Sequence, residues 1–362
     1  MELEEFNMDY KTENSSRNTT IDIIKGFACI AVVWIHYSWS NDAGVFLKTI
    51  SRFAVPFFFF VSGYYLPDRC GQIKPENVRK KIVHIVDITW KSGMFYLFFC
   101  VLWNLLFDRD WSMTAYICEK VTKANVIKLI LANDPLVYDH LWYLLALLYC
   151  YAVMYLFSLK FHNPRNCRVL LPLSLLLMLG FSVLDEFNSV FHIRNAWRLN
   201  EAGTVFVLSN AFLFRAMPFF LFGLFVKTHV REDRPKVSLP VLCGGNLCGM
   251  LIALYEMANT KSLQFYVGTQ ISVICLILIS VWYPRRQMKG MAFIGNKLSM
   301  NVYLYHIAVG KVFDLIAGKK HLWGNQLFRI SRPVLIIVCT LVLSYFLYSI
   351  KERRANAIRQ QA

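Results

Sequence analysis

The chain has 362 residues, of which 56% are hydrophobic and 15% are aromatic, and this composition excludes an ordinary soluble globular protein. The formal net charge is +16. In a soluble protein this excess would favour a nucleic-acid partner, but here the basic residues lie in short segments between apolar stretches, where they set membrane topology, so we expect no nucleic-acid binding. The ten cysteines contain no CxxC pair and no zinc-like spacing, so we expect no metal site.

Apolar segments of suitable length predict an all-α fold, a polytopic membrane helix bundle with about ten transmembrane helices. The polar N-terminal tail, residues 1–20, lacks the apolar core of a signal peptide, so we expect the first membrane helix to act as the insertion signal. One transmembrane domain is predicted over 21–350, followed by a basic tail at 351–362. The predicted spans are 21–39, 51–66, 92–107, 141–159, 169–184, 205–226, 238–256, 265–283, 293–316 and 332–350.

The segments that connect these spans alternate in charge, and one set carries about twice as many Lys and Arg residues as the other. The richer set includes both tails, so the positive-inside rule predicts that both termini are cytoplasmic, in agreement with an even number of spans. The basic stretch 79–91 predicts an interfacial helix before the third span. The pattern over 118–131 predicts one short amphipathic helix in an outer loop.

The first span, IDIIKGFACIAVVWIHYSW, contains two ionisable residues, Lys25 and His36. They are eleven positions apart, which places both on one helical face and separates them by ~16 Å along the axis. Ionisable groups inside a membrane are costly, so this stripe predicts a wet cavity or a bundle interior. His36 suits acid–base chemistry and Lys25 suits phosphate binding. The alternatives are interhelical hydrogen bonding for His36 and snorkelling to the interface for Lys25.

Further polar residues collect at the predicted outer ends of later spans. Arg52 and Arg215 begin two similar elements, RFAVPFFFFVSG and FRAMPFFLFG, and each is a candidate anion binder or an interfacial anchor. In the ninth span, Ser299, Tyr303 and His306 share one face, which suits a pore lining, substrate binding or interhelical hydrogen bonds. A Ser–His nucleophile pair is not expected there, because seven residues separate the two by ~10 Å.

Taken together, these stretches resemble the acyltransferase-3 family, integral membrane O-acyltransferases that modify bacterial surface sugars. The opening helix of that family carries Ile-Asp, a basic residue, ten residues and then His, matched here by Ile21, Asp22, Lys25 and His36, although the family normally has Arg at the position of Lys25. Lysine keeps the charge but loses the bidentate fork of arginine. The other matching motifs are Arg52, Val55, Pro56, Phe58, Phe59, Ser62, Gly63 and Tyr64; His140 to Leu144; and Ser299, Tyr303, Leu304 and His306.

This resemblance implies acetyl-CoA or another acyl-CoA as a cytoplasmic donor, and a hydroxyl of a glycan or a lipid-linked sugar as the acceptor at the outer side. It implies a bacterial inner (plasma) membrane location, with no metal, and leaves a homo-oligomer undecided. His36 is expected to act as the general base or to receive the acyl group, and Lys25 with Asp22 to bind the donor. The residues expected to bind the acceptor or the oxyanion are Arg52, His140, Trp142, Arg215, Ser299, Tyr303 and His306.

Two other functional classes fit parts of the pattern. A transporter of a small polar solute, such as the amino acid serine, would also use a polar stripe across a bundle. However, no inverted repeat and no matching pair of broken helices is visible between the two halves of the chain. A structural or sensory membrane protein is the weakest alternative, because it does not explain an ionisable stripe inside the first span.

Overall fold

The structure, a computed structural model, describes residues 18–68, 70–107, 112–161, 169–190, 211–260, 266–284 and 287–361, and these residues form helices and no strand. Each of the ten predicted spans contains a helix, although residues 205–210 of the sixth, residue 265 of the eighth and residues 1–17 of the tail lie outside the described residues. The main helices are α2 (Thr19–His36), α3 (Asp42–Ile50), α4 (Ala54–Tyr64), α5 (Pro75–Phe107), α6 (Met113–Lys120), α7 (Lys123–Ala132), α8 (Trp142–Lys160), α9 (Leu170–Val190), α11 (Phe212–Arg215), α12 (Met217–His229), α13 (Leu239–Thr260), α14 (Val267–Trp282), α15 (Lys289–Phe293), α16 (Ser299–Lys319) and α17 (Gln326–Gln361).

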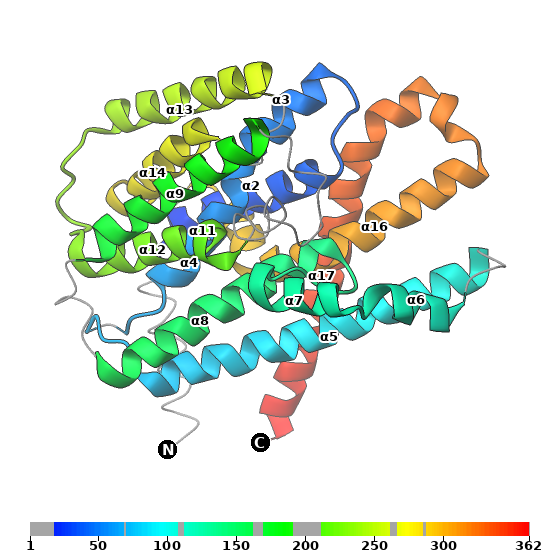
Figure 1. The fold of residues 1–362 in the computed structure, drawn as a ribbon, viewed down its shortest axis with the longest axis horizontal. Coiled ribbons are helices and arrows are strands. Elements are labelled where there is room, and N and C mark those ends of the chain that lie inside the picture. The colour runs from blue at the N-terminus through cyan, green and yellow to red at the C-terminus, as the bar shows by residue number, and fades with distance from the viewer. Residues whose placement is uncertain are drawn as a thin grey trace.

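Helix α2 is the central element, and other helices surround it (Figure 1). It begins because the Asn18 side chain accepts hydrogen bonds from the backbone N–H groups of Thr20 and Ile21. In its most apolar stretch 61% of the residues are buried, against 17% for α5, which faces outward. The helix that carries the predicted ionisable stripe is therefore enclosed by the rest of the bundle.

Helix α5 runs unbroken over 33 residues, so the prediction of a separate interfacial helix at 79–91 before a third span at 92–107 was wrong. Pro75 opens the helix, where a missing N–H costs nothing, and Gly93 inside it meets no neighbour that would force a bend. At ~1.5 Å per residue the helix is ~50 Å long, more than the ~30 Å hydrocarbon core requires. The part of α5 that is not needed to cross this core is its N-terminal part, which carries the basic residues of 79–91.

The outer segment after α5 holds two helices, not the single amphipathic helix predicted over 118–131. Helix α6 ends at Lys120, and α7 starts at Lys123 with the Thr122 hydroxyl accepting from the N–H of Asn125. The side chain of Asn125 also donates to the carbonyl oxygens of Glu119 and Lys120. These bonds satisfy backbone groups at the break, so two short helices replace a longer one.

Helices α4 and α12 cross closely, and they are the two elements with similar sequences. A Cβ atom built on Gly63 would lie 1.9 Å from the carbonyl oxygen of Phe220, and one on Gly223 would lie 2.2 Å from that of Phe60. Beyond the crossing, the Tyr64 hydroxyl donates to Glu232 at 2.5 Å, and Lys227 pairs with the same carboxylate. Partial burial raises the pKa of Glu232, but these two partners outweigh burial and hold that pKa below its ordinary value.

Six segments are long and apolar enough to cross a membrane, and two shorter helices are apolar as well, within the described residues. The chain is therefore a multi-pass membrane protein. The six are Thr19–His36, Asp42–Tyr64, Pro75–Phe107, Asp139–Lys160, Leu239–Asn259 and Gln326–Ile358. The count of ten crossings and the cytoplasmic placement of the termini stay predictions.

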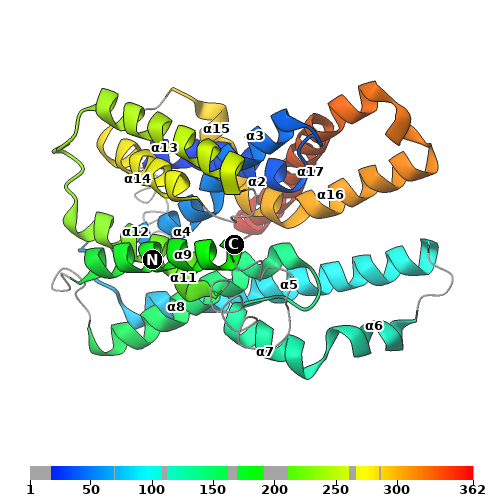
Figure 2. The same cartoon turned by 45° about the horizontal axis from the view of Figure 1, so that its top comes forward.

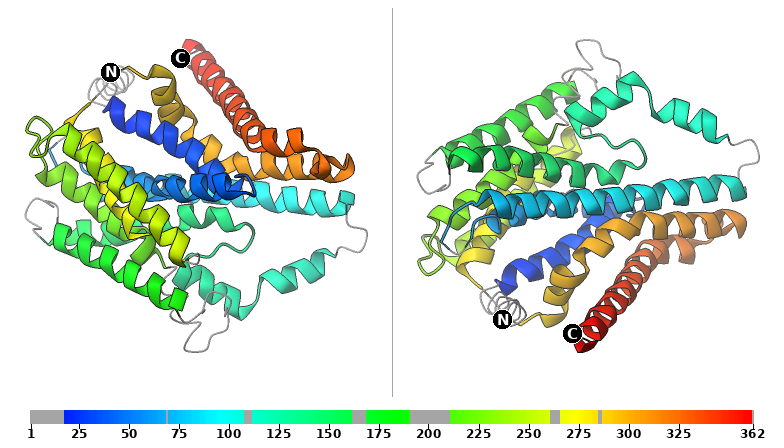
Figure 3. Two further views of the ribbon diagram at one scale, coloured as in Figure 1. Left: turned by 90° about the horizontal axis from the view of Figure 1, so that it is seen from above. Right: turned by 90° about the horizontal axis from the view of Figure 1, so that it is seen from below.

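Helices α16 and α17 form a hairpin that stands out from the body beside the far end of α5 (Figure 2). The Lys319 ammonium lies 4.2 Å from the centre of the Phe107 ring, so the end of α16 contacts the end of α5. Helix α17 continues through residue 350, the predicted end of the membrane domain, to Gln361. Its C-terminal end lies at the same side of the molecule as the beginning of α2 (Figure 3).

Candidate functional site

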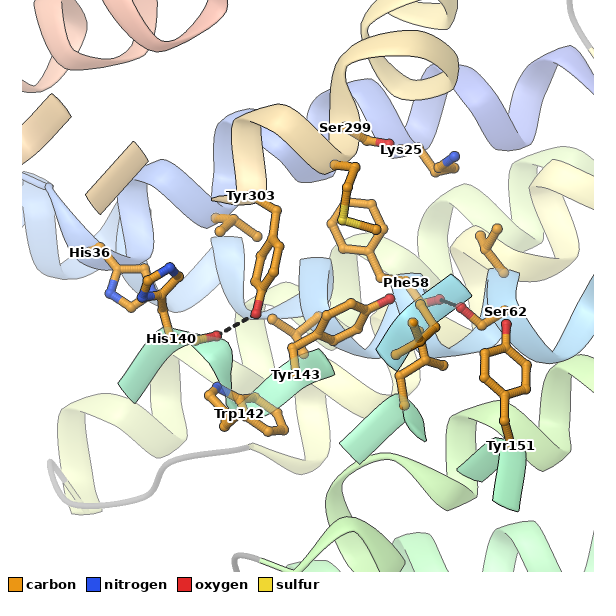
Figure 4. Close-up of a pocket in the computed structure, with 16 residues that line it drawn as sticks. Lys25, His36, Phe58, Ser62, His140, Trp142, Tyr143, Tyr151, Ser299 and Tyr303 are labelled. Atoms are coloured by element: carbon orange, nitrogen blue, oxygen red, sulfur yellow. Dashed lines mark hydrogen bonds between the residues drawn. The ribbon is translucent and has the colours of Figure 1, made fainter. Parts of the chain in front are cut away.

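A cavity of ≈ 220 Å³ lies between α2, α4, α8 and α16, and the predicted residues Lys25 and His36 both line it. They occupy opposite ends of it in Figure 4, as their separation along α2 requires. Four more predicted residues share its wall: His140, Trp142, Ser299 and Tyr303. Polar residues that are spread over nearly 300 positions of the sequence therefore line the same cavity.

The Lys25 end of the cavity is bounded by closely packed helices. Lys25 is 9% exposed and its ammonium lies 4.0 Å from the Asp22 carboxylate, which is also buried. A π-helical turn, η5 (Ile294–Leu298), packs against this part of α2. A Cβ on Gly295 would lie 1.9 Å from the Asp22 carbonyl oxygen, so only glycine permits this approach. The turn leads directly into Ser299 on the cavity wall.

The His36 end is fixed by the residue that follows it. Tyr37 caps α2, its N–H donating to the Val33 carbonyl, and its hydroxyl donates to the Ile307 carbonyl at 3.1 Å. A Cβ on Gly310 would lie 2.0 Å from the Tyr37 ring, so α16 is packed directly on it. His36 itself is solvent-exposed, which places an imidazole at the mouth of the cavity.

Three histidine rings meet at this end. The ring centre of His306 lies 5.1 Å from that of His36 and 5.6 Å from that of His140. His306 is fully buried and does not line the cavity, whereas His36 and His140 do. Tyr303 joins the group through its hydroxyl, which donates to the backbone carbonyl of His140 at 2.6 Å (Figure 4).

Hydroxyl groups line the middle of the cavity, and the sequence prediction did not select them as site residues, although two of them lie in the matched family motifs. They belong to Ser62, Tyr143 and Tyr151, and the Ser62 hydroxyl donates to the Phe58 carbonyl at 3.0 Å. Tyr143, Leu147 and Tyr151 recur every four residues on α8 and all line the cavity, so helical periodicity could have placed the two tyrosines on one face of that helix.

A family model described as an acyltransferase domain matches residues 18–349, nearly the whole chain and every site residue named above. The chain belongs to the acyltransferase 3 family. Family membership indicates acyltransferase chemistry and an acyl donor. The resemblance inferred from four short motifs is confirmed.

Two curated bacterial proteins are similar to this acyltransferase 3 chain. It is 24% identical over 355 residues to an amino-acid racemase of Enterococcus faecalis. The aligned region covers 93% of this chain and 47% of that protein. It is 26% identical over 311 residues to a serine/alanine racemase of Enterococcus gallinarum. That aligned region covers 80% of this chain and 40% of that protein. The chain thus spans about half the length of the curated relatives it matches. No solved structure matches it.

The two predicted arginines of this family member do not line the cavity. The Arg215 guanidinium lies 5.6 Å from the centre of the Trp142 ring, and Trp142 is on the cavity wall. The Arg52 guanidinium lies 5.2 Å from the ring centre of Tyr266, on the side of α14. Arg215 therefore contacts the cavity wall through Trp142, whereas Tyr266, the aromatic neighbour of Arg52, does not line the cavity. Within the described ranges, no group of three or more His, Cys, Asp and Glu residues is arranged to hold a metal ion.

Proposed function

We propose that this protein is a membrane O-acyltransferase that moves an acyl group, acetyl in the simplest case, from cytoplasmic acyl-CoA to a hydroxyl of a glycan or lipid-linked sugar. We place it in the inner or plasma membrane of a bacterium. The observation that carries the proposal is that Lys25 and His36 line one cavity, ~16 Å apart along α2, in a member of the acyltransferase 3 family.

The donor enters from the Lys25 end. The Lys25 ammonium binds a phosphate of the acyl-CoA, and Asp22, 4.0 Å away, holds the ammonium in place. The extended pantetheine arm follows the wall of the cavity from Ser299 toward Tyr303 and carries the thioester to His36. This route explains why a lysine is kept in a site where it is only 9% exposed.

The acceptor hydroxyl is activated at the His36 end. A ring nitrogen of His36 removes the hydroxyl proton as the oxygen attacks the thioester carbonyl, and the proton then passes to the departing CoA thiolate. One O–H bond and one C–S bond break, and one ester C–O bond and one S–H bond form. His140 and the Tyr143 hydroxyl line the cavity beside His36 and supply hydrogen bonds to the acceptor or to the developing oxyanion.

The first test of this proposal is binding of acetyl-CoA to the purified protein in detergent, followed by thermal shift. A ligand that binds the folded state raises the Tm, and we expect that increase for wild type but not for Lys25→Ala. Lys289→Ala is the matched control, because Lys289 is exposed and lies outside the cavity. No shift of the folded wild type at millimolar acetyl-CoA would contradict the donor assignment.

The second test is catalysis. Release of the CoA thiol from acetyl-CoA is expected to fall by about 10³-fold in His36→Ala, since a positioned acid–base group contributes about 10²–10⁴-fold. His84→Ala is the control, because His84 is exposed on α5 and does not line the cavity. Wild-type rates in a folded His36→Ala protein would refute the catalytic role.

Transport of a small amino acid is the second candidate, because the names of the two relatives point to amino acids as ligands. Both are called racemases of amino acids, one of them of serine and alanine, and this chain matches about half of each. A cavity lined by hydroxyls and imidazoles would also hold such a solute. Uptake of labelled serine into proteoliposomes without acyl-CoA would support the transporter, whereas acetyl-CoA consumption without uptake supports the enzyme.

A further inference from the structure

His306 is the one member of the histidine group that does not reach the cavity. It is 0% exposed, and no ion pair of this residue occurs among the described residues. Its Nδ1 atom lies 2.8 Å from the carbonyl oxygen of Tyr303 and 3.1 Å from that of Val302. Carbonyl oxygens only accept hydrogen bonds, so Nδ1 carries a proton.

The other ring nitrogen of His306 is therefore a lone-pair acceptor. An imidazolium buried without an anion would be costly, so the ring is neutral and its Nε2 is unprotonated. Nε2 is buried and accepts no hydrogen bond from the described residues. A buried acceptor without a donor is an energetic cost that folded proteins seldom carry without a functional reason.

The nearest ring to His306 is that of His36, with centres 5.1 Å apart and planes inclined by 48°. Two imidazole nitrogens that point directly at each other across this separation would lie roughly 3 Å apart, which is hydrogen-bond distance. His140 is farther, at 5.6 Å, and meets His306 edge-on. His306 Nε2 has no hydrogen-bond partner in this arrangement, so a hydrogen bond from His36 requires the exposed His36 ring to rotate.

We propose that His306 is a positioning residue that fixes the tautomer of His36. The His36 nitrogen that faces His306 holds the proton and donates it to Nε2, so the nitrogen that faces the cavity keeps its lone pair. This inference rests on the proposed function, because it supplies what a general base requires: a third group that orients it. When His36 takes the proton of the acceptor hydroxyl, the hydrogen bond to His306 stabilises the imidazolium until the CoA thiolate accepts that proton.

The test uses two variants that separate the two nitrogens of His306. His306→Asn keeps an amide N–H near the position of Nδ1 for the backbone carbonyls but removes the acceptor at Nε2. His306→Gln places an amide oxygen near the position of Nε2 and so keeps the acceptor. His84→Gln on α5 is the control for loss of a histidine outside the cavity.

Nitrogen NMR of histidine-labelled protein is the first readout, because it reports which ring nitrogen is protonated and needs no activity. Loss of a signal in His36→Ala assigns His36 among the eight histidines of the chain. We expect one neutral His36 tautomer in wild type and in His306→Gln, and a mixture of both tautomers in His306→Asn. An unchanged His36 tautomer in His306→Asn, or a change confined to His140, would overturn the proposal.

Steady-state kinetics with acetyl-CoA as donor and water as acceptor is the second readout. We expect kcat to fall about 10²-fold in His306→Asn with KM for acetyl-CoA unchanged, and His306→Gln to recover most of it. Equal losses in both variants, together with equal losses of Tm, would show a structural role only and overturn the proposal. A wild type that binds acetyl-CoA but releases no thiol with either water or a glycan acceptor would refute the proposed function, while the tautomer measurement would still decide the role of His306.

Discussion

At the scale of single residues, the cavity hydroxyls offer the sharpest probe of the site. The Tyr143 ring lies 4.7 Å from the ring of Phe59 and 5.3 Å from that of Tyr303, so its packing does not depend on the hydroxyl. Tyr143→Phe removes only that group from the cavity wall. If the hydroxyl stabilises the oxyanion, kcat for acetyl-CoA turnover should fall about 10²-fold, as for other single donors to an oxyanion.

Tyr149→Phe is the matched control for this substitution, because it lies on the same helix and outside the cavity. Its hydroxyl donates to the Leu129 carbonyl on α7 at 3.0 Å. That variant should lose about 1 kcal/mol of stability or less and keep its kcat. Equal kcat values for Tyr143→Phe and wild type would remove Tyr143 from the oxyanion role and leave His140 as the candidate donor.

Single residues could be predicted when the sequence of their own helix marked them, and could not when their role depends on tertiary packing. Lys25 and His36 are ionisable groups inside an apolar helix, which is rare enough to identify them. Tyr143 and Tyr151 are common membrane aromatics; their spacing places them on one face of α8, but only the tertiary structure shows that this face lines the cavity. His306 was grouped with Ser299 and Tyr303 by helical phase, but the structure buries it behind the wall.

At the scale of helices, the glycine pair of α4 and α12 sets how closely α4, which lines the cavity, packs against α12. Ala at position 63 would place its Cβ 1.9 Å from a backbone oxygen that no side-chain rotation can move. Gly63→Ala and Gly223→Ala should each destabilise the protein by about 3 kcal/mol, the upper range for overpacking. Lower Tm values in detergent and a weaker thermal shift with acetyl-CoA are expected together.

Gly244→Ala is the control for helix glycines in general. No atom lies within 4 Å of a Cβ at this position of α13. Alanine is the better helix former by about 0.5–1 kcal/mol, so this variant should be as stable as wild type or more stable. If Gly63→Ala matches Gly244→Ala in Tm, the two helices do not cross as closely as described.

Element boundaries were harder to predict than element existence. The polar stretch 79–91 and the apolar stretch 92–107 were interpreted as two helices. No helix-breaking residue lies between them, so α5 is continuous. The π-helical turn at Ile294–Leu298 gives no periodic signal of its own, and it is stabilised by contact with α2 that only the tertiary structure provides.

At the scale of the whole molecule, the site exists only when distant segments have assembled. His36 and His306 belong to α2 and α16, at opposite ends of the chain, and the donor end depends on the turn that carries Gly295. The proposed reaction also requires a particular orientation in the membrane, with Lys25 at the cytoplasmic face and His36 at the outer face. Membrane orientation is therefore a functional requirement as well as a structural one.

Two native cysteines provide a direct test of that orientation. Cys70 and Cys118 are both free and exposed, and α5 alone separates the segments that hold them. Since α5 is long and apolar enough to cross the bilayer, we expect the two thiols to lie on opposite sides. The charge pattern places Cys70 in the cytoplasm and Cys118 outside. A membrane-impermeant maleimide should label Cys118 in intact cells, and Cys70 only after lysis, with the sites identified by mass spectrometry.

Cys70→Ser and Cys118→Ser are the controls, since each should remove one labelled peptide and leave the other. Labelling of both thiols from the same side would mean that α5 does not cross the membrane, contrary to its length and composition. Labelling of Cys70 alone in intact cells would keep the crossing but reverse the orientation. The Lys25 end of the cavity would then face away from the cytoplasmic acyl-CoA pool, and the proposed donor could not reach it.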